Sequence, residues 1–156
     1  MKIEQRIKQL LDSYTHYALP MLLLIAFGLR WINIQKHSFW YDEALTSLIA
    51  SLSLSEILSN VAATDHPPGY YLLLHFWLHL GQNDAFIRAL PAVFSVATVL
   101  VIYYLGHFLF DQSTGLTAAF IMTILPFQVY FAQENRMYAL IILIATGTTW
   151  LFFKLI

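Results

Sequence analysis

The chain has 156 residues, of which 59% are hydrophobic, 16% aromatic and only 11% charged. A soluble domain carries about 25% charged residues, so this composition excludes an ordinary soluble protein and indicates an integral membrane protein. The net charge of -1 does not indicate any class of partner, and no basic run suggests nucleic-acid binding. Because the chain has no cysteine, disulfides, thiolate metal sites and a cysteine nucleophile are excluded.

The N-terminal part predicts a surface helix followed by a membrane span. Residues 1–13 place three basic residues among apolar residues at helical spacing, which predicts a short amphipathic helix on the cytoplasmic side. Residues 14–34 are long enough to cross a hydrocarbon core of about 30 Å, so we expect the first span there. Arg30 lies near its outer end and is interpreted either as a side chain that reaches the outer headgroups or as a partner for a phosphate or Asp42.

Residues 35–84 are expected to form an outer loop with juxtamembrane helices. Within it, residues 43–62 have apolar residues at helical spacing interrupted by Ser and Thr, which predicts short surface helices and not a span. Ser55, followed by Glu56, predicts a helix start. The apolar stretch 67–80 has only 14 residues, so we expect a juxtamembrane helix that begins at its two prolines.

Three further spans are expected after the outer loop, at residues 85–110, 115–132 and 137–155, with a tight cytoplasmic turn at 111–114. Lys154 agrees with a cytoplasmic exit of the last span. The sequence therefore predicts an all-α integral membrane protein with about four transmembrane helices and one or two outer juxtamembrane helices. Residues 1–156 would form a single membrane domain with both termini cytoplasmic.

This topology brings ionisable residues from four separate places in the chain to the outer interface: Asp42, Glu43, Asp65, His66, Arg88, Glu134 and Arg136. Ionisable groups at membrane depth are costly and tend to mark functional sites. A carboxylate can accept a proton from an attacking hydroxyl, and arginines can hold a phosphate by bidentate hydrogen bonds. Together, these residues suit group transfer from a phosphate-activated, lipid-borne donor.

Four short motifs in this order resemble the N-terminal part of the GT-C fold glycosyltransferases. They are Trp40-Tyr41-Asp42-Glu43-Ala44, the run Asp65-His66-Pro67-Pro68-Gly69-Tyr70-Tyr71-Leu72, Arg88 with Pro91, and Gln133-Glu134-Asn135-Arg136-Met137-Tyr138-Ala139. The nearest likeness is to bacterial family-39-like enzymes related to protein O-mannosyltransferases and lipid A aminoarabinose transferases. The resemblance also implies juxtamembrane helices between the first two spans.

What the resemblance implies is an inverting transfer of a sugar from a polyprenyl-phosphate carrier to a lipid, glycan or protein acceptor. The active site would face outward from a multi-pass protein of the cell (inner) membrane, with membrane lipids and no nucleic acid as further partners. Asp42 would activate the acceptor hydroxyl, and Glu43 would orient the acceptor or its neighbours. His66 matches a His-Pro-Pro motif, and Arg136 would lie near the donor phosphate. Further substrate-binding candidates are Asp65, Arg88, Glu134 and Tyr138.

The acidic and basic candidates also have structural interpretations, which stay open. Asp42 and Glu43 are of the kind favoured in the first turn of a surface helix, where acidic residues complement the helix dipole. Ion pairs at the interface are the alternative for the arginines: Arg88 with Asp84, and Arg136 with Glu134.

The histidines and a metal cofactor are the next alternatives. His66 could cap the turn before Pro67, and the histidines at 75, 79 and 107 are interpreted as interfacial or packed side chains without a role. A divalent metal held by Asp65, His66 and Asp42 is the one cofactor considered. The spacing is not a metal-ligand signature, so no metal ligand is assigned.

The length of the chain leaves two classes of function open. Enzymes of this kind are usually much longer, so we expect the chain to be the N-terminal part of one, or to be completed by a second chain. The alternative is a non-catalytic small membrane protein that serves as a binding or assembly module. A transporter is disfavoured because no expected span carries a charge at its centre.

Overall fold

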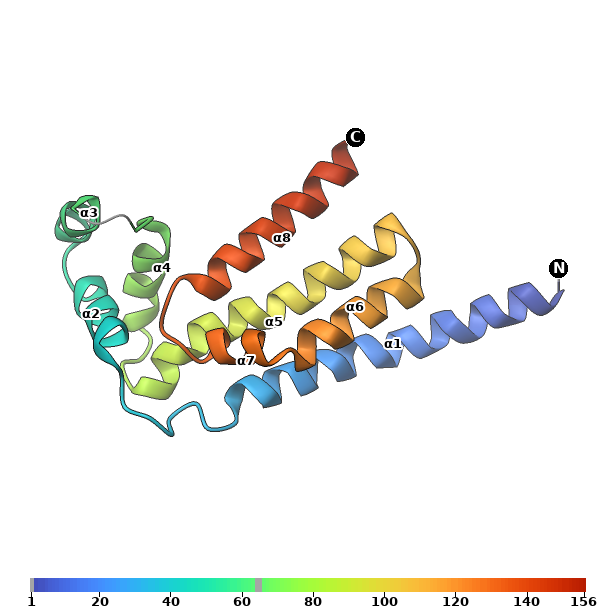
Figure 1. Ribbon diagram of the computed structural model, residues 1–156, viewed down its shortest axis with the longest axis horizontal. Helices are drawn as coiled ribbons and strands as arrows, with labels where there is room; N and C mark the ends of the chain where they lie inside the picture. Colours follow the sequence, from blue (N-terminus) through green and yellow to red (C-terminus); the bar gives the residue numbers. More distant parts are fainter. Residues whose placement is uncertain (1, 64–65) are drawn as a thin grey trace.

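The computed structural model describes residues 2–63 and 66–156, with side chains from residue 17 onward. The described part contains no strand and is built from α-helices: α1 (Lys2–Trp31), α2 (Tyr41–Ala50), α3 (Leu54–Ala62), α4 (Gly69–Leu78), α5 (Asp84–Leu109), α6 (Gln112–Ile124), α7 (Pro126–Ala132) and α8 (Tyr138–Leu155). Long helices run along the molecule, and α2, α3 and α4 gather at one end (Figure 1). The predicted all-α membrane fold is confirmed.

Two helices, α5 with 26 residues and α8 with 18, are long and apolar enough to cross a membrane. The pair α6 and α7 passes the same test when it is counted as one bent span, and residues 17–31 of α1 form a shorter apolar helix. Helices able to cross a membrane are therefore present, and the count of four spans stays a prediction.

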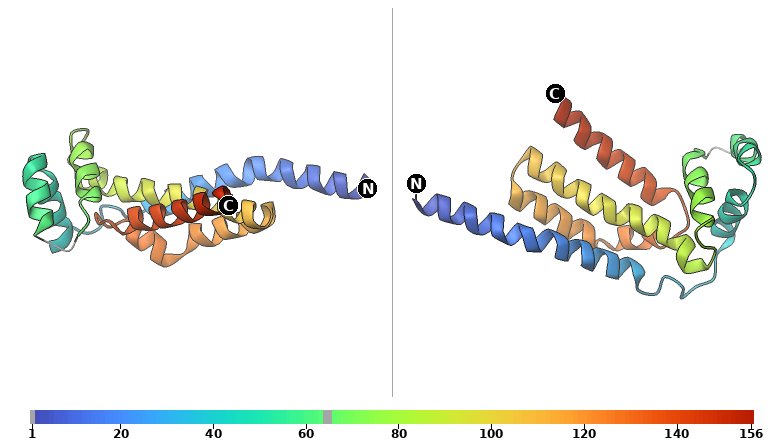
Figure 2. Two further views of the ribbon diagram at one scale, coloured as in Figure 1. Left: turned by 90° about the horizontal axis from the view of Figure 1, so that it is seen from above. Right: turned by 180° about the vertical axis from the view of Figure 1, so that it is seen from behind.

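The ends of the helices separate into two groups along the long axis (Figures 1 and 2). The start of α1, the turn between α5 and α6 and the end of α8 lie away from α2, α3 and α4, whereas the connection between α7 and α8 lies beside them. This arrangement brings residues 133–137 to the same end as the loop 35–84. The predicted topology, in which one site lies on the outer side, requires these two segments to be at the same end.

The first helix differs from the prediction. A separate amphipathic helix over residues 1–13 was expected, but α1 continues without a break from Lys2 to Trp31. The physical reason is that no Gly or Pro lies between residues 2 and 19 to end the helix, and a change from polar to apolar side chains does not interrupt backbone hydrogen bonding.

The segment 115–132, where the third span is expected, is not one continuous helix, because α6 and α7 meet at Leu125 with a bend of 60°. Pro126 causes the break: it has no N–H to donate to the carbonyl of Met122, and it forces Leu125 into an extended conformation. The break leaves the carbonyls at the end of α6 in need of other donors.

Arg30 supplies these donors. Its guanidinium donates to the carbonyl oxygens of Met122 at 3.1 Å and Thr123 at 3.2 Å, and its Nε donates to the hydroxyl of Ser95 at 2.8 Å. The side chain is fully buried and bonded to these groups, so the predicted roles do not apply in this structure: it neither reaches the headgroups nor pairs with Asp42, and it is not open to a phosphate. A buried guanidinium is tolerated here because helix-end carbonyls, which carry partial negative charge, surround it.

The end of α1 is capped in return by Gln133. Its side-chain amide donates to the carbonyl oxygens of Ile32 at 2.8 Å and Arg30 at 3.2 Å. The last carbonyls of a helix have no partner within it, so these bonds satisfy groups that α1 leaves open. The ends of α1 and of the α6–α7 pair therefore fix each other.

The short helices α3 and α4 agree with the prediction, except that the N-cap of α3 is a different serine. Helix α3 begins at Leu54, and Glu56 accepts hydrogen bonds from both the N–H and the hydroxyl of Ser53, so the cap is Ser53 and not the predicted Ser55. Helix α4 lies within the predicted range 67–80 and has 10 residues. Ten residues rise about 15 Å, half of a hydrocarbon core of about 30 Å, so α4 is too short to cross.

Helices α5 and α6 approach closely because glycines face each other. A Cβ atom added to Gly115 would lie 2.6 Å from the backbone oxygen of Tyr103 and 2.9 Å from the backbone nitrogen of His107. A Cβ on Gly106 would meet the Cα of Gly115 at 2.9 Å. Small residues permit such close backbone contact between helices in membranes.

We therefore expect Gly115→Ala to destabilise the protein by about 1–3 kcal/mol, since the added methyl group meets backbone atoms that cannot move aside cheaply. Thermal unfolding in detergent, followed by circular dichroism, measures this. The matched control is Gly147→Ala, because nothing lies within 4 Å of a Cβ at Gly147. Equal melting temperatures for the two variants would contradict the close packing of α5 on α6.

The topology is tested with single cysteines, which this cysteine-free chain permits. We expect cysteines replacing the exposed residues Ser59 and Gln82 to react with an impermeant thiol reagent from outside, and a cysteine replacing Ser113 to be protected. Labelling of intact cells followed by a mass-shift gel gives the readout. Labelling at residue 113 without labelling at residue 82 would contradict the predicted orientation and indicate the opposite one.

Candidate functional site

A buried ion pair joins α2 to α5 at the end of the molecule where α2, α3 and α4 gather. Glu43 is 1% exposed and Arg88 is 5% exposed. The Nη2 of Arg88 donates to Oε2 of Glu43 at 2.6 Å, and its Nε donates to Oε1 at 2.9 Å. This bidentate geometry is the strong form of an arginine–carboxylate pair, and it orients both side chains.

The remaining N–H groups of Arg88 hold the connection between α1 and α2. They donate to the carbonyl oxygens of Ile34 and His37, both at 2.8 Å, and of Ser38 at 3.4 Å. A guanidinium has five N–H donors, and here all five have acceptors. Arg88 thus pairs with Glu43 and not with Asp84, and in this conformation it has no donor left for a phosphate.

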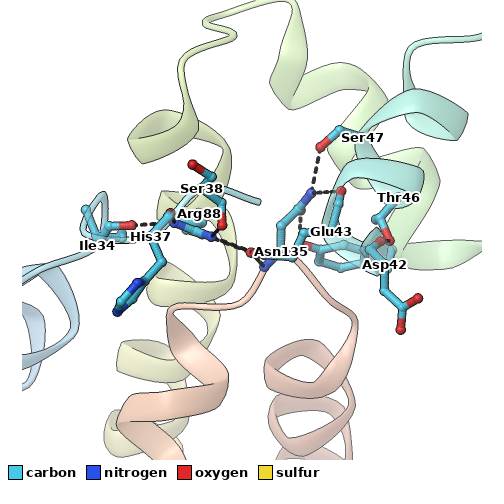
Figure 3. Close-up of polar contacts among 10 residues, drawn as sticks. Ile34, His37, Ser38, Asp42, Glu43, Thr46, Ser47, Arg88 and Asn135 are labelled. Carbon is cyan, nitrogen blue, oxygen red and sulfur yellow. Dashed lines mark hydrogen bonds and ion pairs between the residues drawn. The ribbon is translucent and has the colours of Figure 1, made fainter. Parts of the chain in front are cut away.

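Asn135 connects this ion pair to the segment between α7 and α8 (Figure 3). Its backbone N–H donates to Oε1 of Glu43 at 2.7 Å, and its side-chain amide donates to the hydroxyl of Ser47 at 2.8 Å and the carbonyl of Glu43 at 3.3 Å. The side-chain oxygen accepts from the hydroxyl of Tyr70, in α4, at 2.7 Å. One fully buried residue therefore links α2, α4 and the 133–137 segment.

Tyr70 remains protonated in this arrangement. Burial raises the pKa of its hydroxyl well above the usual value, and the nearby Glu43 carboxylate raises it further. The phenol is therefore a permanent donor to Asn135. Sequence reasoning gave no role to Tyr70 or Asn135; the signal that was available is a polar tetrad, 133–136, between two apolar helices.

Asp42 has a different environment from its neighbour Glu43. Helix α2 buries Glu43, Thr46 and Ala50, which lie on one face, and adjacent residues on a helix point about 100° apart. The side chain of Asp42 is 36% exposed and points away from the buried pair (Figure 3). Of the two predicted catalytic carboxylates, Asp42 is the more exposed one, whereas both carboxylate oxygens of Glu43 already accept hydrogen bonds from Arg88 or Asn135.

Arg136 faces Asp42 across a short gap. The Nη2 of Arg136 lies 3.9 Å from Oδ2 of Asp42 and 3.3 Å from Nε2 of His66, and Nη1 donates to the hydroxyl of Thr46 at 3.1 Å. The guanidinium carbon also lies 6.0 Å from the centre of the Tyr138 ring. We call four of these residues the Asp42 cluster: Asp42, His66, Arg136 and Tyr138. The sequence predicted that these residues lie near one another, and the geometry agrees.

Two buried nitrogen atoms of this cluster lack a hydrogen-bond partner among the described residues: Nε of Arg136 and Nδ1 of His66. A buried donor without a partner costs about 1–3 kcal/mol, and such groups call for an explanation. Arg136 is 8% exposed, so water does not compensate fully. An anionic group bound beside Arg136 and His66 would supply the missing acceptors.

Glu134 lies apart from this cluster. It lines a cavity of about 400 Å³ together with Trp40, Tyr130, Glu43 and Arg88, and its carboxylate shares a hydrogen bond with Tyr130. Among the described residues, the ion-pair partner of Arg136 is Asp42 and not the predicted Glu134. Asp65, a predicted substrate-binding residue, lies outside the described residues.

The metal hypothesis that involved Asp65 is likewise outside the described part. Where the structure is described, no group of three or more His, Asp or Glu side chains could hold a metal ion. The Asp42 cluster itself offers a partly exposed carboxylate, an arginine and an imidazole.

Comparison with known proteins gives one family. A family model described as dolichyl-phosphate-mannose-protein mannosyltransferase matches residues 65–156, more than half of the chain. The match contains His66, Arg88 and Arg136 and begins after Asp42. No curated protein and no solved structure matches the chain.

The two adjacent carboxylates should respond differently to substitution. We expect Glu43→Gln to destabilise the protein by about 3–5 kcal/mol, because it leaves the buried charge of Arg88 without its partner. Asp42→Asn should change stability by less than about 1 kcal/mol, since the side chain is partly exposed and its contact with Arg136 is long. Thermal unfolding in detergent compares the two. A loss of stability in Asp42→Asn as large as in Glu43→Gln would refute the assignment of distinct environments.

Proposed function

We propose that Asp42 is the general base of a sugar transfer from a polyprenyl-phosphate carrier, on the premise that the chain belongs to the dolichyl-phosphate-mannose-protein mannosyltransferase family. The family makes the protein a membrane glycosyltransferase of the GT-C type. The carrier, the outward-facing site and the residue roles are our proposal. The observation that carries it is the separation of two adjacent carboxylates into a buried one and an accessible one.

The proposed reaction is a single displacement at the anomeric carbon. The carboxylate of Asp42 accepts the proton of an acceptor hydroxyl while that oxygen forms its bond to the anomeric carbon. The bond from this carbon to the phosphate oxygen breaks at the same time, and polyprenyl phosphate leaves. Attack from the side opposite the leaving group inverts the configuration of the sugar.

Arg136 and His66 would hold the phosphate of the donor. An arginine binds phosphate through charge-assisted hydrogen bonds, and these matter most where negative charge grows on the leaving group. The unpartnered Nε of Arg136 and Nδ1 of His66 support this role. The Arg136 to Asp42 distance of 3.9 Å allows the base and the leaving-group site to be adjacent.

Glu43, Arg88 and Asn135 would act as positioning residues. They do not reach a substrate in this structure, since their polar groups are used by one another and by the backbone. Their function would be to fix the first turn of α2 and the 133–137 segment, which carry Asp42 and Arg136. Misplacement of reacting groups by about 1 Å can cost roughly 10²-fold in rate.

The outer side of the cell membrane is the proposed location of the reaction. A lipid-linked donor keeps its polyprenyl tail in the bilayer, which suits a site at the end of a helix bundle. The acceptor would be a lipid, glycan or protein with a free hydroxyl. Asp42 and Arg136 lie at the bundle end where α2, α3 and α4 gather, away from the termini.

We expect Asp42→Asn to lower the initial rate of sugar transfer by about 10²–10⁴-fold, the usual contribution of a general base. The assay uses membranes that contain the protein, a panel of polyprenyl-phosphate sugars and candidate lipid, glycan and peptide acceptors. The matched control is Asp84→Asn, which removes the same charge from an exposed residue at the start of α5.

Near-normal turnover of Asp42→Asn would remove Asp42 from the base role. Equal losses in Asp42→Asn and Asp84→Asn would point to a general effect of charge at the membrane surface. Thermal unfolding of the same samples shows whether each variant is still folded. It therefore separates a loss of catalysis from a loss of folded protein.

A further inference from the structure

Two histidines outside the Asp42 cluster lie one helical turn apart. His75 lies in the last turn of α4 and His79 is the C-cap of this helix, four positions later; their ring centres are 5.0 Å apart with an angle of 73° between the planes. Both line a cavity of about 520 Å³. The cavity lies among α2, α4 and the start of α5, and its lining includes none of the residues of the Asp42 cluster.

The hydrogen bonds of the two rings identify which nitrogen carries the proton. Nδ1 of His75 lies 2.9 Å from the carbonyl oxygen of Ala50, and Nδ1 of His79 lies 2.8 Å from the carbonyl oxygen of His75. A carbonyl oxygen only accepts, so each Nδ1 must carry the hydrogen. In the neutral ring Nε2 then has a free lone pair, and neither Nε2 has a hydrogen-bond partner among the described residues.

This pattern is that of a metal-binding pair. Histidines at positions i and i+4 of a helix present their rings on one face, as in zinc sites built on a single helix. A metal-ligating histidine usually donates its other ring N–H to a backbone carbonyl or a carboxylate, which fixes its orientation. His75 and His79 both have this outer bond already.

We propose that His75 and His79 bind a divalent late transition-metal ion through their Nε2 atoms. Imidazole nitrogens favour Zn²⁺, Cu²⁺ and Ni²⁺, and no carboxylate lines the cavity to favour Ca²⁺ or Mg²⁺. Gln82 lines the same cavity and offers an amide oxygen, and water would complete the coordination shell.

The site would act on the α2–α4 region and not on the chemistry at Asp42. His75 is bonded to Ala50, the last residue of α2, and His79 follows the last residue of α4. An ion bound to both rings would therefore hold the end of α4 in place against the end of α2. Any ligand that binds only the folded state raises its stability, so the melting temperature should rise with metal concentration.

The test uses the full chain in detergent with any affinity tag removed. Cu²⁺ and Zn²⁺ are titrated separately, Cu²⁺ by electron paramagnetic resonance and Zn²⁺ by calorimetry. We expect one ion per chain and a Cu²⁺ spectrum with hyperfine structure from two imidazole nitrogens. The melting temperature should rise as Zn²⁺ is added.

The variants His75→Asn and His79→Asn separate metal binding from folding. The asparagine side-chain N–H₂ takes the place of the ring Nδ1–H and can keep the bond to the carbonyl, but it lacks Nε2. Each variant should weaken metal binding by more than about 10-fold. Even the loss of a residue that only orients a metal ligand costs about 10-fold or more. Melting temperatures without metal should stay close to that of the unaltered chain.

A control with the same number of histidines tests the spacing. In His79→Ala with Leu80→His, the second ring moves to the exposed position i+5, off the shared face, so binding should not recover. His107→Asn removes a histidine at the other end of α5 and should have no effect. The proposal is overturned if the unaltered chain binds neither Zn²⁺ nor Cu²⁺, if either asparagine variant binds metal as tightly as the unaltered chain, or if His107→Asn loses as much affinity as they do.

Discussion

The buried pair of Glu43 and Arg88 is the interaction on which the end of the molecule around α2, α3 and α4 depends. Every donor of the guanidinium is used, and the acceptors come from α2 and from the connection between α1 and α2. Removing two charges from water is costly, so such a pair contributes more to a unique arrangement than to net stability. It fixes α2 relative to α5, and through Asn135 it also fixes the segment between α7 and α8.

This constraint explains how two similar neighbours serve different purposes. The helical geometry of α2 turns Glu43 into the protein and leaves Asp42 at its edge, opposite Arg136. An accessible carboxylate next to a rigidly held one is a useful arrangement for proton transfer. In the proposed reaction, Glu43 would set the geometry and Asp42, whose side chain is 36% exposed, would accept the proton of the acceptor hydroxyl.

The sequence predicted what depends on local pattern. Apolar stretches of the right length located α5 and α8, and the short stretch after Pro68 gave α4, because length and hydrophobicity are properties of one segment. The motif around Asp42 and the one around Arg136 also indicated, correctly, that these residues lie near each other.

Long-range pairing could not be predicted in the same way. The long-range partners of Arg30 are 65 to 93 residues away, and two of these three are backbone carbonyls, which carry no sequence signature. Glu43 and Asp42 are indistinguishable in the sequence as acids at a helix start. Asn135 was overlooked because an amide between a glutamate and an arginine has no chemistry of its own; its importance comes from four groups that only the fold brings together.

The buried Arg30 also bears on how the protein enters the membrane. Ribosomes make α1 before Ser95, Met122 and Thr123 exist, so at that stage the guanidinium has none of its partners on α5 and α6. Its place in the last turn of α1 allows the long side chain to extend to the water at the bilayer surface during this interval. Only when the break between α6 and α7 arrives can the side chain turn inward, and that late step locks the earliest helix of the chain to two of the later ones.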